Sequence, residues 1–320
     1  MTNDSLNQEL HQPLSIGRTV FSYGMTAVVF ALTGLALLPL LAILLEIIRQ
    51  GMPQLSWQLF TSLPAPVGLK DVPNGFANAI VGTLMMVGIA CVLSIPFGVM
   101  TGIFLSEFGK GSRVASFIRF VTLILSSVPS IVVGVFAYGV IVLVTKKFSA
   151  VAGGFALAVL MLPIVTLTTE EALKLVPTQI RLASAALGGD RFQTTFRIVV
   201  ASALPGITTG ILLAIARGAG ETAPLLFTAL STQNWPPFAT KFVELLKQPM
   251  GAETISTLKQ IPETLLSPTP SLSVLIFNYA SSPYPEQNKL AWTASLVLVG
   301  MVLLIGILSR VVTRQRFKVR

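Results

Sequence analysis

Two oppositely charged residues interrupt a long apolar segment of this 320-residue chain. Arg217 and Glu221 lie within residues 203–230, ALPGITTGILLAIARGAGETAPLLFTAL, which holds no other charge. An ionised side chain at the centre of a bilayer costs about 2.5–3.5 kcal/mol on insertion scales, so such residues are rare and usually functional. At this spacing the two residues share one helix face and can pair. A cation that a carboxylate partly neutralises is able to hold an anion briefly and release it, so the pair predicts a passage for a negatively charged solute.

The composition of the whole chain predicts a membrane protein. Hydrophobic residues make up 53% and charged residues only 11%, whereas soluble domains carry about 25% charged residues. The net charge of +9 fits basic cytoplasmic loops beside anionic lipids. Cys91 and His11 are the single cysteine and histidine, which excludes an internal disulfide and makes a zinc or haem site, and hence a cofactor, unexpected. The polar start MTNDSLNQELHQP does not resemble a cleavable signal peptide.

Six apolar segments are long enough to cross a bilayer, which takes about 20 residues. They cover approximately residues 22–48, 77–105, 118–144, 150–168, 203–230 and 291–308. The predicted fold class is therefore all-α, a polytopic membrane bundle of six transmembrane helices. We expect a cytoplasmic N-terminal tail over 1–21, a six-span domain over 22–310 with a cytoplasmic loop over 169–202, and a basic cytoplasmic tail over 311–320.

The distribution of Lys and Arg predicts the orientation of these spans. Basic residues are denser in one set of connecting segments, which includes Arg113, Arg181 and Arg191 and ends in the basic tail. Because short cytoplasmic loops carry an excess of Lys and Arg, this set is expected inside, together with both termini. The loops near 49–76 and 231–290 are then outside. Lys146 and Lys147 are exceptions, since they fall in a short outer turn.

The predicted cytoplasmic loop contains signals for short helices. Thr169 is expected to cap a helix whose first turn holds Glu170 and Glu171 as solvated charges, and Pro177 suits the first position of the next helix. That second helix has an apolar face and ends at Gly188-Gly189, and Asp190 can cap a third helix. Its predicted face comprises Ile180, Ala183, Ser184 and Leu187. An amphipathic helix of this kind docks into a groove on a partner or lies on the lipid surface.

This loop resembles the cytoplasmic signature of ABC-transporter permeases, which is Glu-Ala-Ala, three residues, Gly, nine residues, Ile, one residue and Leu-Pro. Gly188 and Ile198 match this signature. Leu182 stands where the acidic residue is expected, and Val200-Ala201 stand where Leu-Pro is expected. Four further segments are similar to the permeases of phosphate-specific ABC importers, and those over 216–230 and 271–292 are similar to the A-type subunit in particular. The similarity covers about residues 75–310. These segments are MLPIVTLTTEEALKLVP (161–177), SVPSIVVGVFAYG (127–139), ARGAGETAPLLFTAL (216–230) and SLSVLIFNYASSPYPEQNKLAW (271–292).

The resemblance implies a MetI-like ABC permease fold in the bacterial inner membrane and a set of partners. A second permease subunit of the C type would pair with this chain around one pathway, an ATPase dimer would dock on the cytoplasmic side, and a periplasmic phosphate-binding protein would dock outside. The helix over about 178–188 would be the coupling helix, and Glu170 could meet an ATPase lysine. The residues implied in coupling are Ile180, Ala183, Ser184, Ala186, Leu187, Gly188 and Ile198.

The sequence also indicates that the energy source belongs to another polypeptide. Moving one negative charge inward against 100 mV costs about 2.3 kcal/mol, yet the chain lacks the GxxxxGK(S/T) pattern of a nucleotide-binding loop, because GKGSR (109–113) has the wrong spacing. The chain is therefore expected to be a transport subunit and not an enzyme.

On this interpretation Arg217, Glu221 and Thr222 line the substrate pathway. A guanidinium offers a planar fork for phosphate oxygens. The carboxylate of Glu221 keeps the empty site from being strongly positive, and it can accept a hydrogen bond from a protonated phosphate. Alternatively, Arg217 and Glu221 form an inter-helix salt bridge that fixes packing against the partner permease. At the level of function, the alternatives are a permease for another oxyanion (sulfate, molybdate or phosphonate) and a stand-alone secondary carrier or anion channel.

Overall fold

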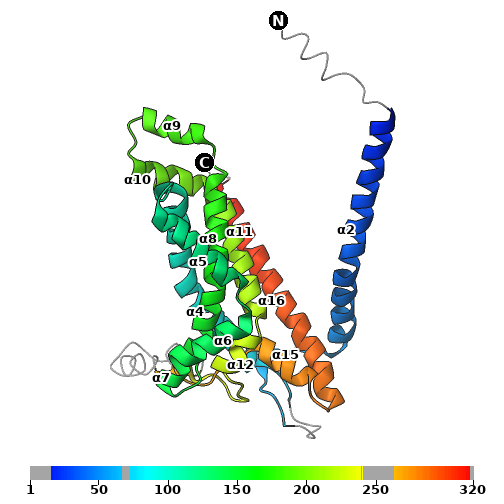
Figure 1. Ribbon diagram of the computed structural model, residues 1–320. Coiled ribbons are helices and arrows are strands. Elements are labelled where there is room, and N and C mark those ends of the chain that lie inside the picture. The colour runs from blue at the N-terminus through cyan, green and yellow to red at the C-terminus, as the bar shows by residue number, and fades with distance from the viewer. Residues whose placement is uncertain (1–15, 67–72, 239, 241–262, 318–320) are drawn as a thin grey trace, which may run out of the picture. The chain divides into compact units, whose positions relative to one another are not determined.

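The computed structural model describes residues 16–66, 73–238, 240 and 263–317 of the chain, and every regular element in these ranges is helical (Figure 1). His11, the first residues of the predicted N-terminal tail, and most of the segment 239–262 lie outside the described residues. The chain divides into two compact units, Met1–Gln50 and Gly51–Arg320. The predicted all-α fold class is confirmed.

The first unit contains nearly all of one long helix, α2 (Ile16–Gly51). Its apolar stretch is longer than the predicted span of 22–48, so it has ample length to cross a bilayer. Pro39 lies inside this helix. Arg49 occupies the last turn, where a cation interacts favourably with the helix dipole. Its Nη2 atom lies 3.0 Å from Glu46 Oε1.

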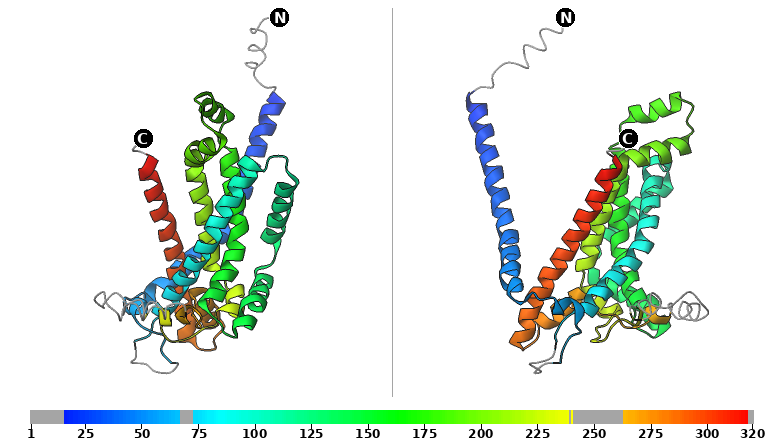
Figure 2. Two further views of the ribbon diagram at one scale, coloured as in Figure 1. Left: turned by 90° about the vertical axis from the view of Figure 1, so that its left-hand side faces the viewer. Right: turned by 180° about the vertical axis from the view of Figure 1, so that it is seen from behind.

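The second unit begins with the short elements η1 (Met52–Gln54) and α3 (Gln58–Thr61) and then forms a helical bundle (Figures 1 and 2). The long helices of the bundle are α4 (Ala77–Ile103), α5 (Arg113–Ser127), α8 (Ala150–Lys174), α11 (Val200–Gly220) and α16 (Pro285–Phe317). Shorter elements connect them: η2 (Phe104–Phe108), α6 (Ser130–Ala137), η3 (Tyr138–Val142), α7 (Leu143–Thr145), α9 (Thr178–Ala186), α10 (Arg191–Gln193), η4 (Thr194–Val199), α12 (Ala223–Thr228) and α15 (Leu272–Ala280).

The shorter elements gather at the two ends of this second unit. One end carries α9, α10 and the C-terminal end of α16, and the opposite end carries α6, α7, α12 and α15 (Figures 1 and 2). The end with α9 is the one that holds Arg113, Arg181 and Arg191. The charge asymmetry predicted from the sequence is therefore also an asymmetry between the two ends of the bundle.

Five helices of the described chain are long and apolar enough to cross a membrane, and a bent pair of helices provides a sixth candidate. The bent pair joins 113–127 to 130–145 at an angle of 103°, so the segment predicted as the third span over 118–144 is a broken helix pair. The bend has a local cause: Val128 precedes Pro129 and adopts an extended conformation with ψ 130°, because the proline ring excludes the helical conformation from the residue before it.

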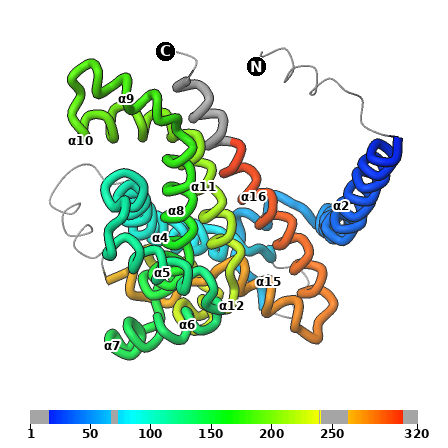
Figure 3. Tube along the Cα trace, turned by 45° about the horizontal axis from the view of Figure 1, so that its top comes forward, coloured from blue at the N-terminus to red at the C-terminus, as the bar shows by residue number. Residues whose placement is uncertain are grey.

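Helix α8 forms the centre of the bundle, with α4 on one side and α11 on the other (Figure 3). About two thirds of its apolar window is buried, which is more than in any other candidate span of the described chain. The core between these helices includes Met86, Leu157, Met161 and Val165. Glycines allow α4 and α8 to approach closely, since a Cβ atom at Gly98 would lie 2.8 Å from the Val165 side chain.

A very close backbone approach joins α4 to the segment before α15. A Cβ atom at Gly82 would lie 1.9 Å from the carbonyl oxygen of Pro270. The Thr83 hydroxyl accepts a hydrogen bond from the backbone N–H of Leu272 at 2.8 Å beside it. Residue 82 must therefore be glycine for these two segments to keep their contact.

We predict that Gly82→Ala destabilises the protein by about 2 kcal/mol or more, because the added methyl group overlaps a backbone carbonyl that a side-chain rotation cannot move away. Thermal unfolding of the purified protein in detergent measures the change. Gly88→Ala is the matched control in the same helix, since nothing lies within 4 Å of a Cβ atom there. Equal midpoints for the two variants would contradict the close packing described.

Candidate functional site

Arg217 and Glu221 meet at the C-terminal end of α11. The Nε atom of Arg217 lies 3.5 Å from Oε1 of Glu221, with 51% of the arginine side chain and 16% of the glutamate side chain exposed. The predicted contact between the two residues is confirmed. Its geometry is loose, because charge-assisted N–H···O contacts are normally about 2.7–2.9 Å. The guanidinium therefore remains available to another anion.

The predicted continuous helix over 203–230 is wrong at this site. Helix α11 ends at Gly220, Glu221 is extended with ψ 130°, and α12 begins at Ala223 with Pro224 in its first turn. The break leaves polar backbone groups that need partners inside a membrane. The Ser273 hydroxyl of α15 donates to the Glu221 carbonyl at 2.9 Å, and the Glu221 N–H donates to Gly218 O at 3.3 Å.

Thr222 occupies the break itself. It stands at the N-cap of α12, but its side chain does not cap that helix. Within the described part of the chain, its hydroxyl makes no hydrogen bond. The three predicted pathway residues therefore lie close together in the sequence around one helix break, with Arg217 in the last turn of α11 and Glu221 and Thr222 in the break itself. The arginine and the threonine hydroxyl retain hydrogen-bonding capacity.

Helix α11 has two different faces along its length. One face packs into the bundle and consists of Ala203, Ile207, Gly210, Ala214 and Gly218. The opposite face is exposed and consists mainly of small or hydroxyl-bearing residues, namely Ser202, Pro205, Gly206, Thr209, Leu213, Arg217 and Gly220. We call this second set the exposed stripe of α11. The sequence reasoning missed it, although small and hydroxyl residues recur there every three or four positions.

The end of the stripe away from Arg217 opens into a groove of about 680 Å³ between α8, α9 and α11. Residues lining the groove include Thr168, Ala172, Leu175, Ile180, Ser202 and Thr209. Ser202 and Thr209 direct their hydroxyl hydrogens back to the carbonyls of Ile198 and Pro205 at 2.8 Å. Their oxygen lone pairs are left to face the groove, so the stripe offers acceptors and few donors.

The predicted coupling helix exists as α9, but its exposed face differs from the prediction at two residues. Ile180, Ala183, Ala186, Leu187 and Gly188 are exposed, and Leu187 is 90% exposed. Ser184 is instead buried, with its Oγ 2.7 Å from Thr194 Oγ1, and Ile198 is half-buried in η4. Ser184 therefore holds α9 against the following segment and is not available to a docking partner.

The predicted signals at the ends of these short helices are largely correct. Gly188 has φ +81°, a conformation that favours glycine, and the helix ends immediately before it. The Asp190 carboxylate accepts a hydrogen bond from the Gln193 N–H at 2.6 Å and so caps α10. Pro177 stands one position earlier than predicted, at the N-cap of α9.

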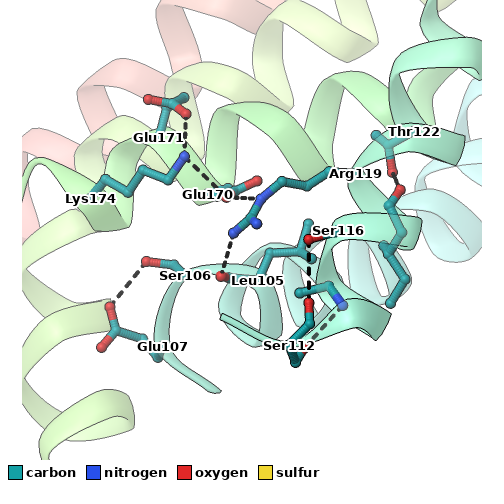
Figure 4. A network of polar contacts seen from close by, with 12 residues as sticks. Leu105, Ser106, Glu107, Ser112, Ser116, Arg119, Thr122, Glu170, Glu171 and Lys174 are labelled. Atoms are coloured by element: carbon teal, nitrogen blue, oxygen red, sulfur yellow. Dashed lines mark hydrogen bonds and ion pairs between the residues drawn. The ribbon is translucent and has the colours of Figure 1, made fainter. Parts of the chain in front are cut away.

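The prediction of a capped helix beginning at Thr169 is wrong. Helix α8 continues without a break to Lys174, so Thr169 and Glu170 lie inside it and are buried. Glu170 is 2% exposed and accepts from Arg119 Nε of α5 at 2.7 Å and from Lys174 Nζ at 3.0 Å (Figure 4). It is not a solvated charge and does not face a partner. Glu171 is 67% exposed, as predicted, and pairs only with Lys174.

The described residues contain no group of three or more His, Cys, Asp or Glu side chains that could hold a metal ion. The polar groups of this site are instead arginines, single carboxylates and hydroxyls. Such groups bind and release anions by hydrogen bonding and charge, without covalent chemistry.

Comparison with known proteins identifies the class of this membrane protein. The family described as "Binding-protein-dependent transport system inner membrane component" matches residues 94–318. A chain of the MetNI methionine ABC transporter, solved in inward-facing conformations, shares the fold with a TM-score of 0.53 at 17% identity over 74% of this chain and 94% of that chain.

Curated relatives define the class more closely. The Phosphate transport system permease protein PstA of Haemophilus influenzae is 40% identical over 84% of this chain and 85% of its own length, and that of Yersinia pestis is 41% identical over 85% and 83%. The Probable phosphate transport system permease protein PstA of Methanocaldococcus jannaschii is 32% identical over 91% and 93%. The chain therefore belongs to the binding-protein-dependent transport permeases and, within them, to the PstA family.

We predict that Glu170→Gln lowers the stability of the protein by about 1–3 kcal/mol, because Arg119 loses its charged partner in a buried contact. Glu171→Gln should change stability by less than about 0.5 kcal/mol, since its carboxylate is solvated. Thermal unfolding in detergent compares the two neighbouring variants. Equal changes in stability for the two variants would show that the buried contacts of Glu170 do not stabilise the protein.

Proposed function

We propose that this chain forms half of the anion pathway of an ATP-driven phosphate importer and that Arg217 is the phosphate contact in that pathway. The observation that supports this most directly is the half-exposed guanidinium at the break after α11, held at 3.5 Å by Glu221, in a chain whose curated relatives are phosphate transport permeases. A permanently charged guanidinium in an apolar span is energetically costly, so its presence there favours a functional role.

Affinity at this site must be low enough for release. Glu221 offsets part of the positive charge of Arg217, so a phosphate ion replaces a weak contact and leaves again when the site opens inward. The hydroxyl of Thr222 supplies an additional donor beside it. N-terminal to Arg217, the polar side chains of the exposed stripe are the hydroxyls of Ser202 and Thr209, whose hydrogens are donated to backbone carbonyls. They provide little attraction for an anion and so favour its passage.

Glu221 also has a role in selectivity. Phosphate at neutral pH carries at least one O–H group, which can donate to a carboxylate, whereas sulfate is fully ionised and is repelled. A carboxylate beside the arginine therefore distinguishes phosphate from sulfate, because only phosphate carries a proton that the carboxylate can bind.

Three partner subunits would complete the proposed importer. Inward movement of phosphate against the membrane potential needs energy, so an ATPase dimer would dock on the exposed face of α9, around Ala183, Ala186 and Leu187. A C-type permease would complete the pathway opposite α11, and a periplasmic phosphate-binding protein would dock at the end with α12 and α15. The basic end with α9 would be cytoplasmic, together with both termini.

The alternative functions make different predictions for reconstituted protein. A permease for sulfate, molybdate or phosphonate would move that oxyanion under the same conditions, and a stand-alone carrier or channel would move anion without an ATPase. Uptake of phosphate that requires the ATPase, ATP and the binding protein together supports the proposed function. Uptake by the chain alone would overturn it.

We predict that Arg217→Gln lowers phosphate uptake by the reconstituted complex at least about tenfold, because a hydrogen-bonded charge contact contributes about 1.5–3 kcal/mol. Assembly and basal ATP hydrolysis should be unchanged. Arg197→Gln, at an exposed arginine of η4, is the matched control. If Arg217→Gln prevents assembly, the arginine is a packing residue and the pathway role is wrong.

We also predict that Glu221→Gln reduces the preference for phosphate over sulfate, because the amide no longer repels a fully ionised anion. Competition of sulfate with labelled phosphate uptake measures the change, and an increase in sulfate inhibition of about tenfold or more is expected from loss of one like-charge contact. Glu286→Gln, at an exposed position in the first turn of α16, is the control. Unchanged selectivity would remove the discrimination role of Glu221.

A further inference from the structure

Three arginines from three different segments converge on the short π-helical turn η2 at the end of α4. Arg119 of α5 donates to Leu105 O at 2.9 Å (Figure 4), Arg181 of α9 binds the carboxylate of Glu107, and Arg191 of α10 donates to Glu107 O. A π-helical turn is rare and often occurs at functional sites. We call this set, centred on Glu107, the η2 hub.

The contact between Glu107 and Arg181 is the best satisfied ion pair of the hub. Arg181 Nη2 lies 2.7 Å from Oε1 of Glu107 and Nε lies 3.3 Å from Oε2, with 8% of the glutamate and 17% of the arginine side chain exposed. Arg181 also donates to Leu173 O at 2.9 Å and to Val176 O. A guanidinium that uses both edges of its fork holds its helix in a defined orientation.

Arg191 ties the other side of the Gly188-Gly189 turn to the same element. Its guanidinium carbon lies 5.1 Å from the centre of the Phe108 ring, and Phe108 also packs against Phe192 with ring centres 5.9 Å apart. The segments before and after the turn are therefore both attached to η2. Displacement of α9 must move the end of α4 or break these contacts.

The contacts of α4 extend from the hub to the pathway. Gly102 of α4 is packed against Thr169 of α8, where a Cβ atom would lie 2.7 Å from the threonine side chain. Gly210 of α11 is packed still more closely against Thr168 of the same turn of α8, where a Cβ atom would lie 2.1 Å from the threonine side chain. These glycine contacts place α4 and α11 directly against the same turn of α8, so packed side chains and backbone connect the η2 hub with the helix that carries Arg217.

We infer that Glu107 is the positioning residue that transmits the movement of α9 to α4 during ATP-driven transport, with Arg181 as its partner. This inference rests on the proposed function, since α9 is there the element on which the ATPase acts. It assigns a transport role to a carboxylate that neither touches the substrate nor faces a partner.

The test uses the complete complex in proteoliposomes, namely both permeases, the ATPase and the binding protein, and it measures phosphate taken up per ATP hydrolysed. Glu107→Gln keeps the shape of the side chain but removes its charge, so ATP hydrolysis should stay within about twofold of wild type while this ratio falls at least tenfold. Arg197→Gln, at an exposed arginine of η4 at the same end of the bundle, is the control and should leave the ratio unchanged.

Arg181→Gln and the double variant complete the test. If Glu107 and Arg181 act as one unit, each single variant and the double variant lose the same factor. Losses that multiply in the double variant would overturn the inference, and so would an unchanged ratio in Glu107→Gln. If the Glu107→Gln complex fails to assemble, Arg181→Lys provides a second test, because lysine keeps the ion pair but loses the two-point contact of the guanidinium. A reduced ratio of phosphate taken up per ATP in an assembled complex supports the inference. An unchanged ratio overturns it.

The outcomes also separate this inference from the proposed function. A wild-type complex that hydrolyses ATP and imports sulfate but no phosphate would overturn the phosphate assignment. The ratio would then be measured with sulfate, and the result expected for Glu107→Gln would be the same.

Discussion

The structure of this permease depends on the cost of placing a charge in apolar surroundings. Glu107 and Glu170 are almost completely buried, and each is bound by an arginine at 2.7 Å. Arg217 differs, since half of its side chain is exposed and its contact to Glu221 is stretched to 3.5 Å. A short, buried ion pair stabilises one arrangement of helices, whereas a loose and accessible one can exchange its partner. This difference separates the charges that hold the bundle from the charge proposed to meet the substrate.

Interrupted helices surround the loose pair. The break after α11 and the bend between α5 and α6 both involve proline, and the two interrupted spans meet, because a Cβ atom at Gly134 of α6 would lie 2.6 Å from Pro224 of α12. Within a bilayer such breaks persist only where side chains satisfy the freed backbone groups. Ser273 does this for Glu221. The site is therefore held by the α15 segment and not by helix propensity alone.

Several features with local causes could be predicted from the sequence, and burial that depends on distant residues could not. The apolar segments, the helix stop at Gly188 and the cap at Asp190 depend on neighbouring residues, and all were predicted. The family was predicted from its motifs and is confirmed by the relatives. Burial of Glu170 was not predicted, because its partner Arg119 is 51 residues away in the chain. Ser184 was misplaced for the same reason, since only the position of Thr194 shows which side of α9 is covered.

The central claim is that the exposed stripe of α11 is in contact with water during transport. Single cysteines in a Cys91→Ser background of the assembled complex test this directly with a membrane-impermeant thiol reagent. We predict that Thr209→Cys and Leu213→Cys react during turnover and that Ala203→Cys and Ala214→Cys on the packed face do not. Phosphate should slow labelling at Leu213→Cys, one turn from the intact arginine. Absence of labelling along the stripe in resting and working complexes alike would contradict the account.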